Sequence, residues 1–317
     1  MNIVIITPPA APTLGGNRNT AQRWCRFLRY FGHRVSIQTE WSGDAADLMI
    51  ALHARKSHAS IKRFASLMPR APLVVCLTGT DLYRDIKSDA SAQESLKLAE
   101  RIIVLQEMAL NELSTDTRGK ARVIYQSAKP IKPAAPLKNQ FEICIIGHLR
   151  EEKDPFRCAM ALSYLPQSSR IRICHIGRAR SAEMENQARQ WMVREPRYRW
   201  IGEIPHWQVR KRLARTRAMV ISSRMEGGAN VVSEALAAHV PVVASRIPGN
   251  IGMLGIDYKG YYAAEDKRQL AALLQRLETD RDFYFYLKKQ CAKRLPLVQE
   301  KCELESLRML VAEISRH

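Results

Sequence analysis

Short apolar runs of strand length alternate with helical patterns along this chain of 317 residues, and the alternation occurs in two series. In the first series, we predict strands at Ile3–Thr7, Arg34–Thr39, Leu48–Leu52, Leu73–Thr78, Ile102–Gln106 and Val123–Tyr125, with helices such as Thr20–Phe31 and Ala59–Met68 between them. In the second series, the predicted strands are Phe141–Ile146, Ile171–Ile176, Tyr198–Ile201, Ala218–Ile221, Val240–Ala244 and a weaker Tyr261–Ala263. Regular alternation of this kind predicts parallel, doubly wound sheets, so the expected fold class is α/β.

A proline-rich segment separates the two series. Residues 129–138, KPIKPAAPLK, contain three prolines and three lysines and cannot continue a helix or a sheet. We therefore predict a first domain over residues 1–128, a linker over 129–139 and a second domain over 140–290. Residues 266–316 show a helical pattern that Pro296 interrupts, so residues 291–317 are expected to be C-terminal helices.

The formal net charge of +19 favours anionic partners, such as nucleotides, phosphates, nucleic acid or a membrane surface. The basic residues are spread along the chain, however, without a recognised nucleic-acid-binding motif. The densest run, Arg210-Lys211-Arg212, is expected to be the solvated face of an exposed helix, although an amphipathic membrane-binding helix at 206–217 stays open. We therefore expect neither a nucleic-acid partner nor a stable membrane association, and the oligomeric state is left open.

The cellular compartment is predicted from the N-terminus and the cysteines. The first residues, MNIVIITPPAAP, carry no basic leader and indicate a first strand rather than a signal peptide, and no apolar run reaches the length of a membrane span. The seven cysteines are scattered without a C-x-x-C pair, and three of them lie inside apolar strand patterns. A reduced, cytoplasmic protein without disulfides or a metal site is expected.

Polar residues follow several predicted strands of the first series. They are Gly15–Thr20 after the first strand, His53–Lys56 after the third, Thr78–Asp85 after the fourth and Tyr125–Ser127 after the sixth. Because the carboxyl ends of parallel strands lie at one edge of a sheet, these residues are expected to line a ligand-binding cleft.

The stretch SSRMEGGANVVSEALAAH, residues 222–239, combines a glycine pair with a predicted helix start. Gly227-Gly228 leaves backbone amides free at the positive end of a helix, for which Asn230 is the expected N-cap, and this arrangement suits a phosphate. Glu226 and Glu234 flank the turn and are expected to bind hydroxyl groups. The simpler alternative is an ordinary helix start with two solvated carboxylates.

The spacing of two glutamates separated by seven residues resembles the nucleotide-sugar site of the retaining GT-B glycosyltransferases, in the group known as glycosyltransferase family 4. In that family the first glutamate contacts the transferred sugar and the second holds the ribose hydroxyls. The resemblance implies these roles for Glu226 and Glu234, and backbone contacts to the donor from Gly227, Gly228, Ala229, Asn230 and Val231. It also implies the GT-B fold: two Rossmann-like domains facing a cleft, with the helical C-terminus crossing back to the first domain.

A basic turn, Gly147-His148-Leu149-Arg150-Glu151-Glu152-Lys153-Asp154-Pro155, follows the first strand of the second series. It is similar to the family pattern G-R-L-x-x-x-K-G, whose Arg and Lys neutralise the donor diphosphate. Lys153 matches the lysine, whereas His148 replaces the arginine and Asp154 replaces the glycine, so Arg150 is a candidate for the missing charge. A protonated His148 is a second donor candidate. The alternative is a plain basic turn capped by Asp154.

Other positions complete the donor site that the resemblance implies. Gly202, Glu203 and Ile204 match the turn where the family reads the base, Gly177 is expected to line the same pocket, and Gly16 is assigned to the donor from the first domain. The segment Pro241–Gly249 resembles the family's P-V-V-A-S strand and glycine turn. Since protein cations take the role that Mg²⁺ has elsewhere, no metal or other cofactor is expected.

Several segments together resemble one narrow branch, the selenosugar synthases of selenoneine biosynthesis: GNRNTAQRW, TEW, ALHARKS, LTGTDLYRD, GHLREEKDP, SSRMEGGANVVSEALAA and ASRIPGNIGMLG. This resemblance implies a UDP-sugar donor, UDP-N-acetylglucosamine or UDP-glucose, and selenophosphate as the acceptor. The expected products are a 1-selenosugar, UDP and phosphate. Glu226, Lys153 and His148 are the expected catalytic residues.

The predicted acceptor site lies at the strand ends of the first domain. Its candidate residues are Asn17, Arg18, His53, Arg55, Lys56, Thr80, Asp81 and Arg84, several of which bring positive charge; each of these cations has an ordinary surface role as its alternative. Selenophosphate arrives as an anionic nucleophile and needs cations rather than a general base. Two other functions stay open: transfer to a carbohydrate or lipid hydroxyl, and nucleotide or nucleic-acid binding without catalysis.

Overall fold

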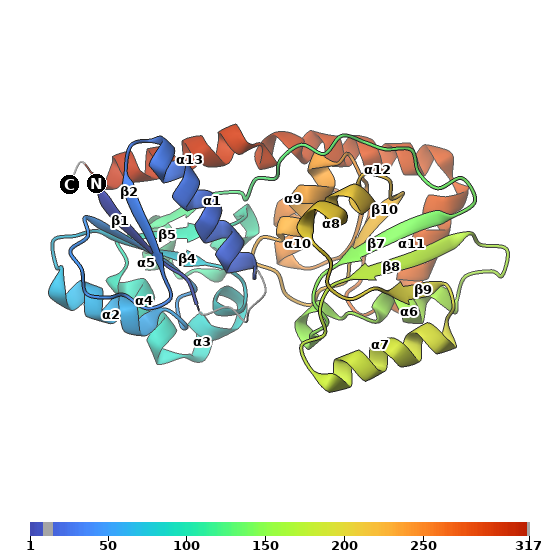
Figure 1. The fold of residues 1–317 in the computed structure, drawn as a ribbon, viewed down its shortest axis with the longest axis horizontal. Coiled ribbons are helices and arrows are strands. Elements are labelled where there is room, and N and C mark those ends of the chain that lie inside the picture. The colour runs from blue at the N-terminus through green and yellow to red at the C-terminus, as the bar shows by residue number, and fades with distance from the viewer. Residues whose placement is uncertain (9–14, 316–317) are drawn as a thin grey trace. The chain divides into compact units, whose positions relative to one another are not determined.

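The computed structural model describes residues 1–8 and 15–315, which form two compact units. The first unit contains Met1–Gln126, Glu226–Gly228 and the segment from Glu300 onward. The second unit contains Ser127–Met225 and Ala229–Gln299. Each unit has its own six-stranded sheet, and all strand pairs in both sheets are parallel (Figure 1).

The sheet of the first unit has the strand order β2-β1-β3-β4-β5-β6. Its strands are β1 (Asn2–Ile6), β2 (Arg34–Gln38), β3 (Leu48–Leu52), β4 (Leu73–Leu77), β5 (Arg101–Val104) and β6 (Ala121–Val123). Its helices are α1 (Gly16–Tyr30), α2 (His58–Leu67), the π-helix η1 (Asp81–Asp85), α3 (Ile86–Ser88), α4 (Ala90–Leu98), the 3₁₀ helix η2 (Glu107–Glu112), α5 (Thr115–Gly119) and α13 (Glu300–Ile314).

Helices cover both faces of this sheet because strand side chains alternate between two apolar cores. On one face, Trp24 and Phe27 of α1 and Leu307 of α13 pack with Ile3 and Ile5 of β1. On the other face, helices α2 and α4 pack over Val4, Ile6 and their neighbours in the adjacent strands. Figure 1 shows α13 beside α1, although these helices stand at opposite ends of the sequence.

The sheet of the second unit has the strand order β12-β11-β10-β7-β8-β9. Its strands are β7 (Phe141–Ile146), β8 (Ile171–Ile176), β9 (Tyr198–Trp200), β10 (Ala218–Ile221), β11 (Val242–Ser245) and β12 (Tyr261–Tyr262). Its helices are η3 (Glu151–Lys153), α6 (Arg157–Leu162), α7 (Ala182–Arg194), α8 (His206–Leu213), α9 (Asn230–Ala237), α10 (Pro248–Leu254), α11 (Lys267–Thr279), α12 (Arg281–Arg294) and η4 (Leu295–Val298).

Both strand orders contain a point at which the chain reverses its direction across the sheet. In the first unit the reversal lies between β1 and β3, and in the second unit it lies between β7 and β10. The crossover connections on the two sides of such a point go to opposite faces, so ligands bind there, beyond the carboxyl ends of the strands. The predicted two-series α/β fold with parallel, doubly wound sheets is therefore confirmed.

The proline-rich segment has neither helix nor strand from 124 to 137, and its backbone is attached to the second unit. The amides of Ile131 and Ala134 donate to the carbonyls of Ala237 and Ala214, at 3.1 and 2.9 Å. The guanidinium of Arg210 donates to the carbonyls of Lys129 and Pro130, at 3.2 and 2.8 Å. The segment is thus held along the second unit by hydrogen bonds.

These contacts correct the prediction that the basic run of α8 is a solvated face. Besides the two bonds of Arg210, Arg212 forms an ion pair of 2.9 Å with Glu142, a buried residue of β7. Lys211 is exposed, as predicted. Two of the three cations in this run therefore hold neighbouring segments of the unit in place.

Three local predictions differ from the structure, and the first of them exceeds the usual uncertainty of one or two residues at element ends. Helix α1 begins at Gly16 rather than Thr20, so Gly16, Asn17 and Arg18 lie in its first turn. The sixth strand is Ala121–Val123 rather than Val123–Tyr125, because Ala121 pairs with Ile102. Helix α9 is capped by Ala229, and Asn230 is its first helical residue rather than its N-cap.

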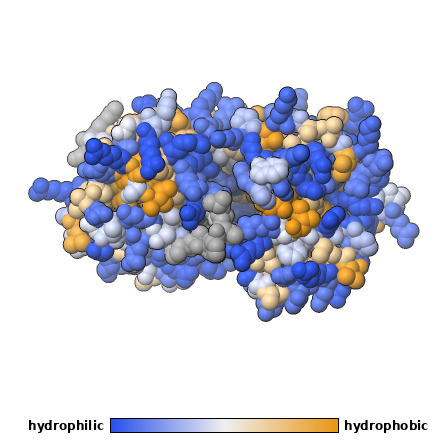
Figure 2. Space-filling view, viewed as in Figure 1, coloured by the Kyte–Doolittle hydropathy of each residue, from blue (hydrophilic) through white to orange (hydrophobic). Residues whose placement is uncertain are grey.

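The described surface has no large apolar region on the face shown in Figure 2, where hydrophobic residues form separate small patches among hydrophilic ones. All seven cysteines are free thiols, and six of them are buried. Across residues 1–8 and 15–315, none of the helices has the length and apolar character needed to cross a membrane.

Helix α13 is joined to α1 by a buried polar contact that yields a stability prediction. The carboxylate of Glu303 is 1% exposed and accepts from Trp24 Nε1 and Arg23 Nε, both at 2.7 Å. Glu303→Ala should lower the free energy of unfolding by about 3–5 kcal/mol, because it leaves an arginine and an indole N–H without this acceptor in a buried environment. Urea denaturation measures the change. The control is Glu300→Ala, which removes an exposed ion pair with Arg26 on the same helix and should cost less than about 1 kcal/mol.

Candidate functional site

The turns that follow β7 and β8 in the second unit are joined by backbone hydrogen bonds. The amide of Gly147 donates to Ile176 at 2.9 Å, and the amide of Leu149 donates to Arg178 at 2.9 Å. The amide of Arg180 donates back to Leu149 at 3.1 Å. These bonds extend the strand pairing past the ends of the strands and hold the two turns side by side, on the β7 side of the reversal of strand order.

Gly177 makes this close approach possible. Its φ is +152°, and a Cβ atom at this position would lie 1.9 Å from the carbonyl oxygen of Gly147. Its own amide donates to Gly202 at 2.8 Å, and its carbonyl accepts from Trp200 Nε1 at 2.7 Å. The predicted base-binding positions Gly177 and Gly202 are thus in direct contact, and the exposed Glu203 and partly buried Ile204 follow in the same turn.

The imidazole of His175 in β8 is hydrogen-bonded to the turn after β7. Its Nδ1 lies 2.8 Å from the hydroxyl of Tyr198 and its Nε2 lies 3.2 Å from the carbonyl of Gly147. Since a carbonyl can only accept, Nε2 carries the proton and Nδ1 accepts from the tyrosine. Complete burial lowers the pKa of His175 to about 4, so the ring is neutral at neutral pH and the hydrogen bonds keep one tautomer.

His148 is neutral as well, which corrects the interpretation of this residue as a protonated donor. Burial, followed by the charges of Arg180, Arg150, Lys153 and Arg178, lowers its pKa to about 4. Its Nδ1 accepts from the backbone amide of Arg178 at 3.1 Å, which places the ring proton on Nε2. His148 therefore retains one N–H donor but no positive charge in the free protein.

The other end of the basic turn is fastened to β10. The hydroxyl of Ser222 donates to the carbonyls of Lys153 and Asp154, at 3.0 and 2.9 Å. Asp154 has a left-handed backbone, with φ +43°, which explains why the family pattern has glycine at this position. Its carboxylate forms an ion pair with Arg157 at 2.7 Å. The departure from the pattern at Asp154 therefore preserves the conformation of the turn.

Helix α9 begins at Asn230, and Ala229 separates it from the glycine pair of the predicted anion site. Val231 is in its first turn, and Glu234 follows one turn later. One carboxylate oxygen of Glu234 lies 2.9 Å from Nε2 of His206, the first residue of α8, and this contact raises the pKa of His206. This hydrogen bond holds one oxygen of Glu234 and thereby orients the carboxylate that we predict to bind ribose.

The residues 226–228 cluster with the first unit. A Cβ atom on Gly227 would lie 2.4 Å from the carbonyl oxygen of Thr78, and one on Gly228 would lie 2.4 Å from the Cβ of Leu105. Glu226 is buried, and its charge raises the pKa of the Tyr83 hydroxyl, after the larger effects of burial and Glu112. Both glycines are therefore required by close packing, whatever the ligand.

Asp81 organises the turn after β4 in the first unit. Its buried carboxylate accepts from the amides of Thr78, Gly79 and Ala54, at 2.9, 2.8 and 3.0 Å. These bonds connect the turns after β3 and β4, on one side of the reversal of strand order. Asp81 is one of the residues that we predict to bind the acceptor substrate. In the structure, its carboxylate oxygens already accept hydrogen bonds from three backbone amides.

His53 is buried beside the carboxylates of Asp81 and Asp85. Burial, its largest effect, lowers the pKa of His53. Its Nδ1 accepts from the amide of Lys56 at 3.3 Å, so Nε2 carries the proton and faces Thr80 Oγ1 at 3.1 Å. A ring in this tautomer has no free nitrogen to accept a proton from an acceptor hydroxyl.

Asp85 pairs with two of the remaining predicted cations of the first unit, Arg55 and Arg84. The guanidinium groups of Arg55 and Arg84 lie 3.0 and 3.2 Å from its buried carboxylate, and both are about half exposed. Lys56 is exposed on the turn after β3, and Arg18 is exposed in the first turn of α1. An anionic acceptor would have to compete with Asp85 for the two arginines.

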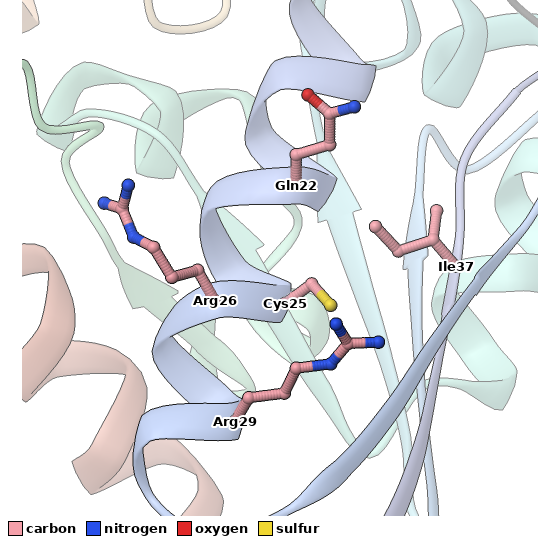
Figure 3. A pocket seen from close by; sticks show the side chains of 5 residues that line it. All are labelled: Gln22, Cys25, Arg26, Arg29 and Ile37. Atoms are coloured by element: carbon pink, nitrogen blue, oxygen red, sulfur yellow. The ribbon is translucent and has the colours of Figure 1, made fainter.

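A separate shallow depression of about 410 Å³ lies on the first unit, between α1 and β2 (Figure 3). It is lined by Gln22, Cys25, Arg26, Arg29 and Ile37, none of which is a predicted site residue. Its arginines are engaged, since Arg29 donates to Val35 O at 2.7 Å and Arg26 pairs with Glu300. Within residues 1–8 and 15–315, we find no group of three metal-binding side chains, and metal independence stays a prediction.

Comparison with known proteins identifies the family. Residues 128–294, more than half of the chain, match the family described as glycosyl transferases group 1. The chain belongs to the group 1 glycosyltransferases. The matched region contains the basic turn after β7, the arginine-containing turn after β8 and the glutamate pair around α9.

Solved structures share the whole fold of this glycosyltransferase. HepE of Anabaena, solved with UDP and glucose, aligns with a TM-score of 0.80 at 14% identity, covering 99% of this chain and 100% of that one. Sucrose-phosphate synthase of Thermosynechococcus elongatus gives 0.80 at 15% identity, with 99% of both chains covered. A glycosyltransferase of Rickettsia africae gives 0.75 at 13% identity, covering 100% and 99%. At these identities the similarity establishes the GT-B fold.

Sequence reasoning missed four residues of this region in the glycosyltransferase. His175 and His206 stand in a strand and at a helix start, where no spacing relates them to Gly147 or Glu234. Arg178 and Arg180 were passed over because they lie outside the pattern G-R-L-x-x-x-K-G. Their position directly after a predicted strand was the one available signal.

Gly177→Ala tests the contact between the two turns. The added methyl group cannot fit against the carbonyl of Gly147, so the turns must separate, and we expect a loss of about 1–3 kcal/mol in the free energy of unfolding. Gly119→Ala is the control, because no atom lies within 4 Å of its added methyl group. Equal stabilities of the two variants in urea denaturation would show that the contact is not as tight as described.

His148 should titrate near pH 4 in the free protein, and NMR of the imidazole carbons measures this directly. Because its pKa is lowered in the folded state, as is that of His175, the unfolded chain binds more protons between pH 6.5 and 4. Stability should therefore fall as the pH drops through this range. Adding UDP should raise the pKa of His148, since a bound diphosphate offsets the surrounding cations; an unchanged value would place the diphosphate elsewhere.

Proposed function

We propose that this glycosyltransferase transfers the sugar of a UDP-sugar, UDP-N-acetylglucosamine, to selenophosphate and thereby forms a carbon–selenium bond. The reaction consumes UDP-N-acetylglucosamine, selenophosphate and water, and it releases the 1-selenosugar, UDP and phosphate. The bond between the anomeric carbon and the UDP oxygen breaks as selenium attacks that carbon. Water then cleaves the phosphorus–selenium bond and takes the phosphate.

The observation that supports a UDP-sugar donor is the position of the sequence motifs in the second unit. The basic turn with Lys153 follows β7, and the segment leading to Glu234 follows β10, so they flank the reversal of strand order. Ser222 fastens the two together. A nucleotide bound there would meet cations at its diphosphate and the His206-oriented carboxylate at its ribose. The complex of HepE with UDP and glucose supports the same class of donor.

The proposal that selenophosphate is the acceptor rests on the resemblance to the selenosugar synthases and on the chemistry of the first unit. The buried imidazole there, His53, has Nδ1 occupied by the amide of Lys56 and is unsuited to serve as a general base. Arg18, Arg55, Lys56 and Arg84 expose guanidinium or ammonium groups in the same unit. These properties suit an acceptor that arrives as an anion and needs no deprotonation.

A product assay tests the proposal. The protein is incubated with UDP-N-acetylglucosamine and selenophosphate, and the products are identified by mass spectrometry, with UDP-glucose, orthophosphate and simple sugar acceptors in parallel. We expect a selenium-containing sugar and stoichiometric UDP, with activity retained in EDTA. Transfer to a hydroxyl acceptor with no turnover of selenophosphate would replace the acceptor half of the proposal with an ordinary O-glycosyltransferase. UDP-dependent turnover that EDTA abolishes would contradict the metal-independent site.

Glu234→Ala and Glu226→Ala should affect the donor differently. Loss of ribose hydrogen bonds to the Glu234 carboxylate should weaken UDP binding by about 1.5–3 kcal/mol, measured by calorimetry. Glu226→Ala should leave UDP affinity unchanged and lower kcat, since its expected partner is the sugar. His206→Ala should weaken UDP binding less than Glu234→Ala, because it frees but does not remove the carboxylate. Unchanged UDP affinity in Glu234→Ala would exclude the ribose role.

A further inference from the structure

Three arginines stand on the two joined turns of the second unit. Arg150 follows β7, and Arg178 and Arg180 follow β8, immediately before Ser181, the N-cap of α7. The Leu149–Ala179 backbone bridge holds the two turns in register, and all three arginine side chains are exposed. The arginines therefore lie on adjacent, rigidly connected backbone at the strand carboxyl ends.

Several other arginines near the predicted sites are paired with carboxylates. Arg55 and Arg84 pair with Asp85, Arg157 pairs with Asp154, and Arg224 pairs with Glu265. In the part of the chain that the structure describes, no ion pair includes the three arginines of the joined turns. The exposed carboxylate of Glu203 is the acidic group that acts on Arg180, and its effect is smaller than those of burial, Arg150 and Arg178.

The positive charges of this cluster act on one another and on His148. Burial and the charges of Arg150 and Arg178 lower the pKa of Arg180. Among the cations that lower the pKa of His148, Arg180 has the largest effect. The free protein thus keeps several like charges around one imidazole, an arrangement that a bound anion would stabilise.

We propose that Arg178 and Arg180 join Arg150 in binding the phosphate oxygens of a nucleoside diphosphate, in place of the arginine that the basic turn lacks at His148. The bond from the Arg178 amide to His148 Nδ1 attaches the arginine-containing turn to the very position where the family pattern has arginine. Guanidinium groups suit this role because they donate two parallel hydrogen bonds to phosphate oxygens. The identity of the ligand rests on the proposed function, whereas the binding of a phosphate anion does not.

Calorimetric titrations of Arg178→Ala, Arg180→Ala and the double variant test the proposal. Each single substitution should weaken UDP binding about tenfold, and the double variant more, while binding of uridine stays unchanged. Arg189→Ala is the control, because Arg189 is an exposed arginine of α7 that pairs with Glu185 at 2.7 Å. Unchanged UDP affinity in the double variant overturns the proposal, and so does an equal loss for UDP and uridine, which would indicate contacts to the nucleoside.

Thermal unfolding with inorganic pyrophosphate separates this proposal from the proposed function. Pyrophosphate should raise the Tm of the wild type, and the double variant should lose this shift although its own Tm is unchanged or higher, since two repelling charges are gone. A wild type that responds to pyrophosphate but binds no UDP would leave the arginine site standing and refute the nucleotide donor. Equal pyrophosphate shifts in the wild type and the double variant would refute the arginine site.

Discussion

The reversal of strand order between β7 and β10 is the constraint on which the predicted donor site depends. All strands of the second sheet are parallel, so every carboxyl end reaches the same edge, but only at the reversal do neighbouring connections diverge to opposite faces. The basic turn and the segment before α9 lie on the two sides of this point, and Ser222 joins them. Close packing of Gly177 against Gly147 then brings the turn after β8 to the same place.

Charge is distributed differently in the two units. In the first unit, Asp81 accepts from backbone amides, Asp85 pairs with Arg55 and Arg84, and burial lowers the pKa of His53, whereas Arg18 and Lys56 are exposed. In the second unit, Arg150, Arg178 and Arg180 surround a neutral His148. Within the described residues, the three arginines of the second unit that form no ion pair thus lie where a diphosphate is proposed to bind, whereas Arg55 and Arg84 of the first unit are paired with Asp85.

Much of the fold was predictable, because burial on both faces gives parallel strands a continuous apolar sequence such as Leu48–Leu52 or Leu73–Leu77. Predictions failed where local sequence is ambiguous: α1 begins at Gly16, although glycine and asparagine in its first turn have low helix propensity and Thr20 is its first buried residue. The burial of His53 and the bonds of Arg210 to the proline-rich segment were not predictable, since their partners are distant in sequence.

The sequence by itself determined the two α/β halves, the family pattern around Lys153 and the Glu226–Glu234 spacing, because these depend on apolar periodicity and on residues near one another in the chain. Only the tertiary structure decided the strand order, the neutrality of His148, the pairing of Glu234 with His206 and the gathering of three arginines on joined turns. Each of these depends on electrostatic or steric contact between segments separated by about 30 residues or more, and no local pattern encodes such a distance.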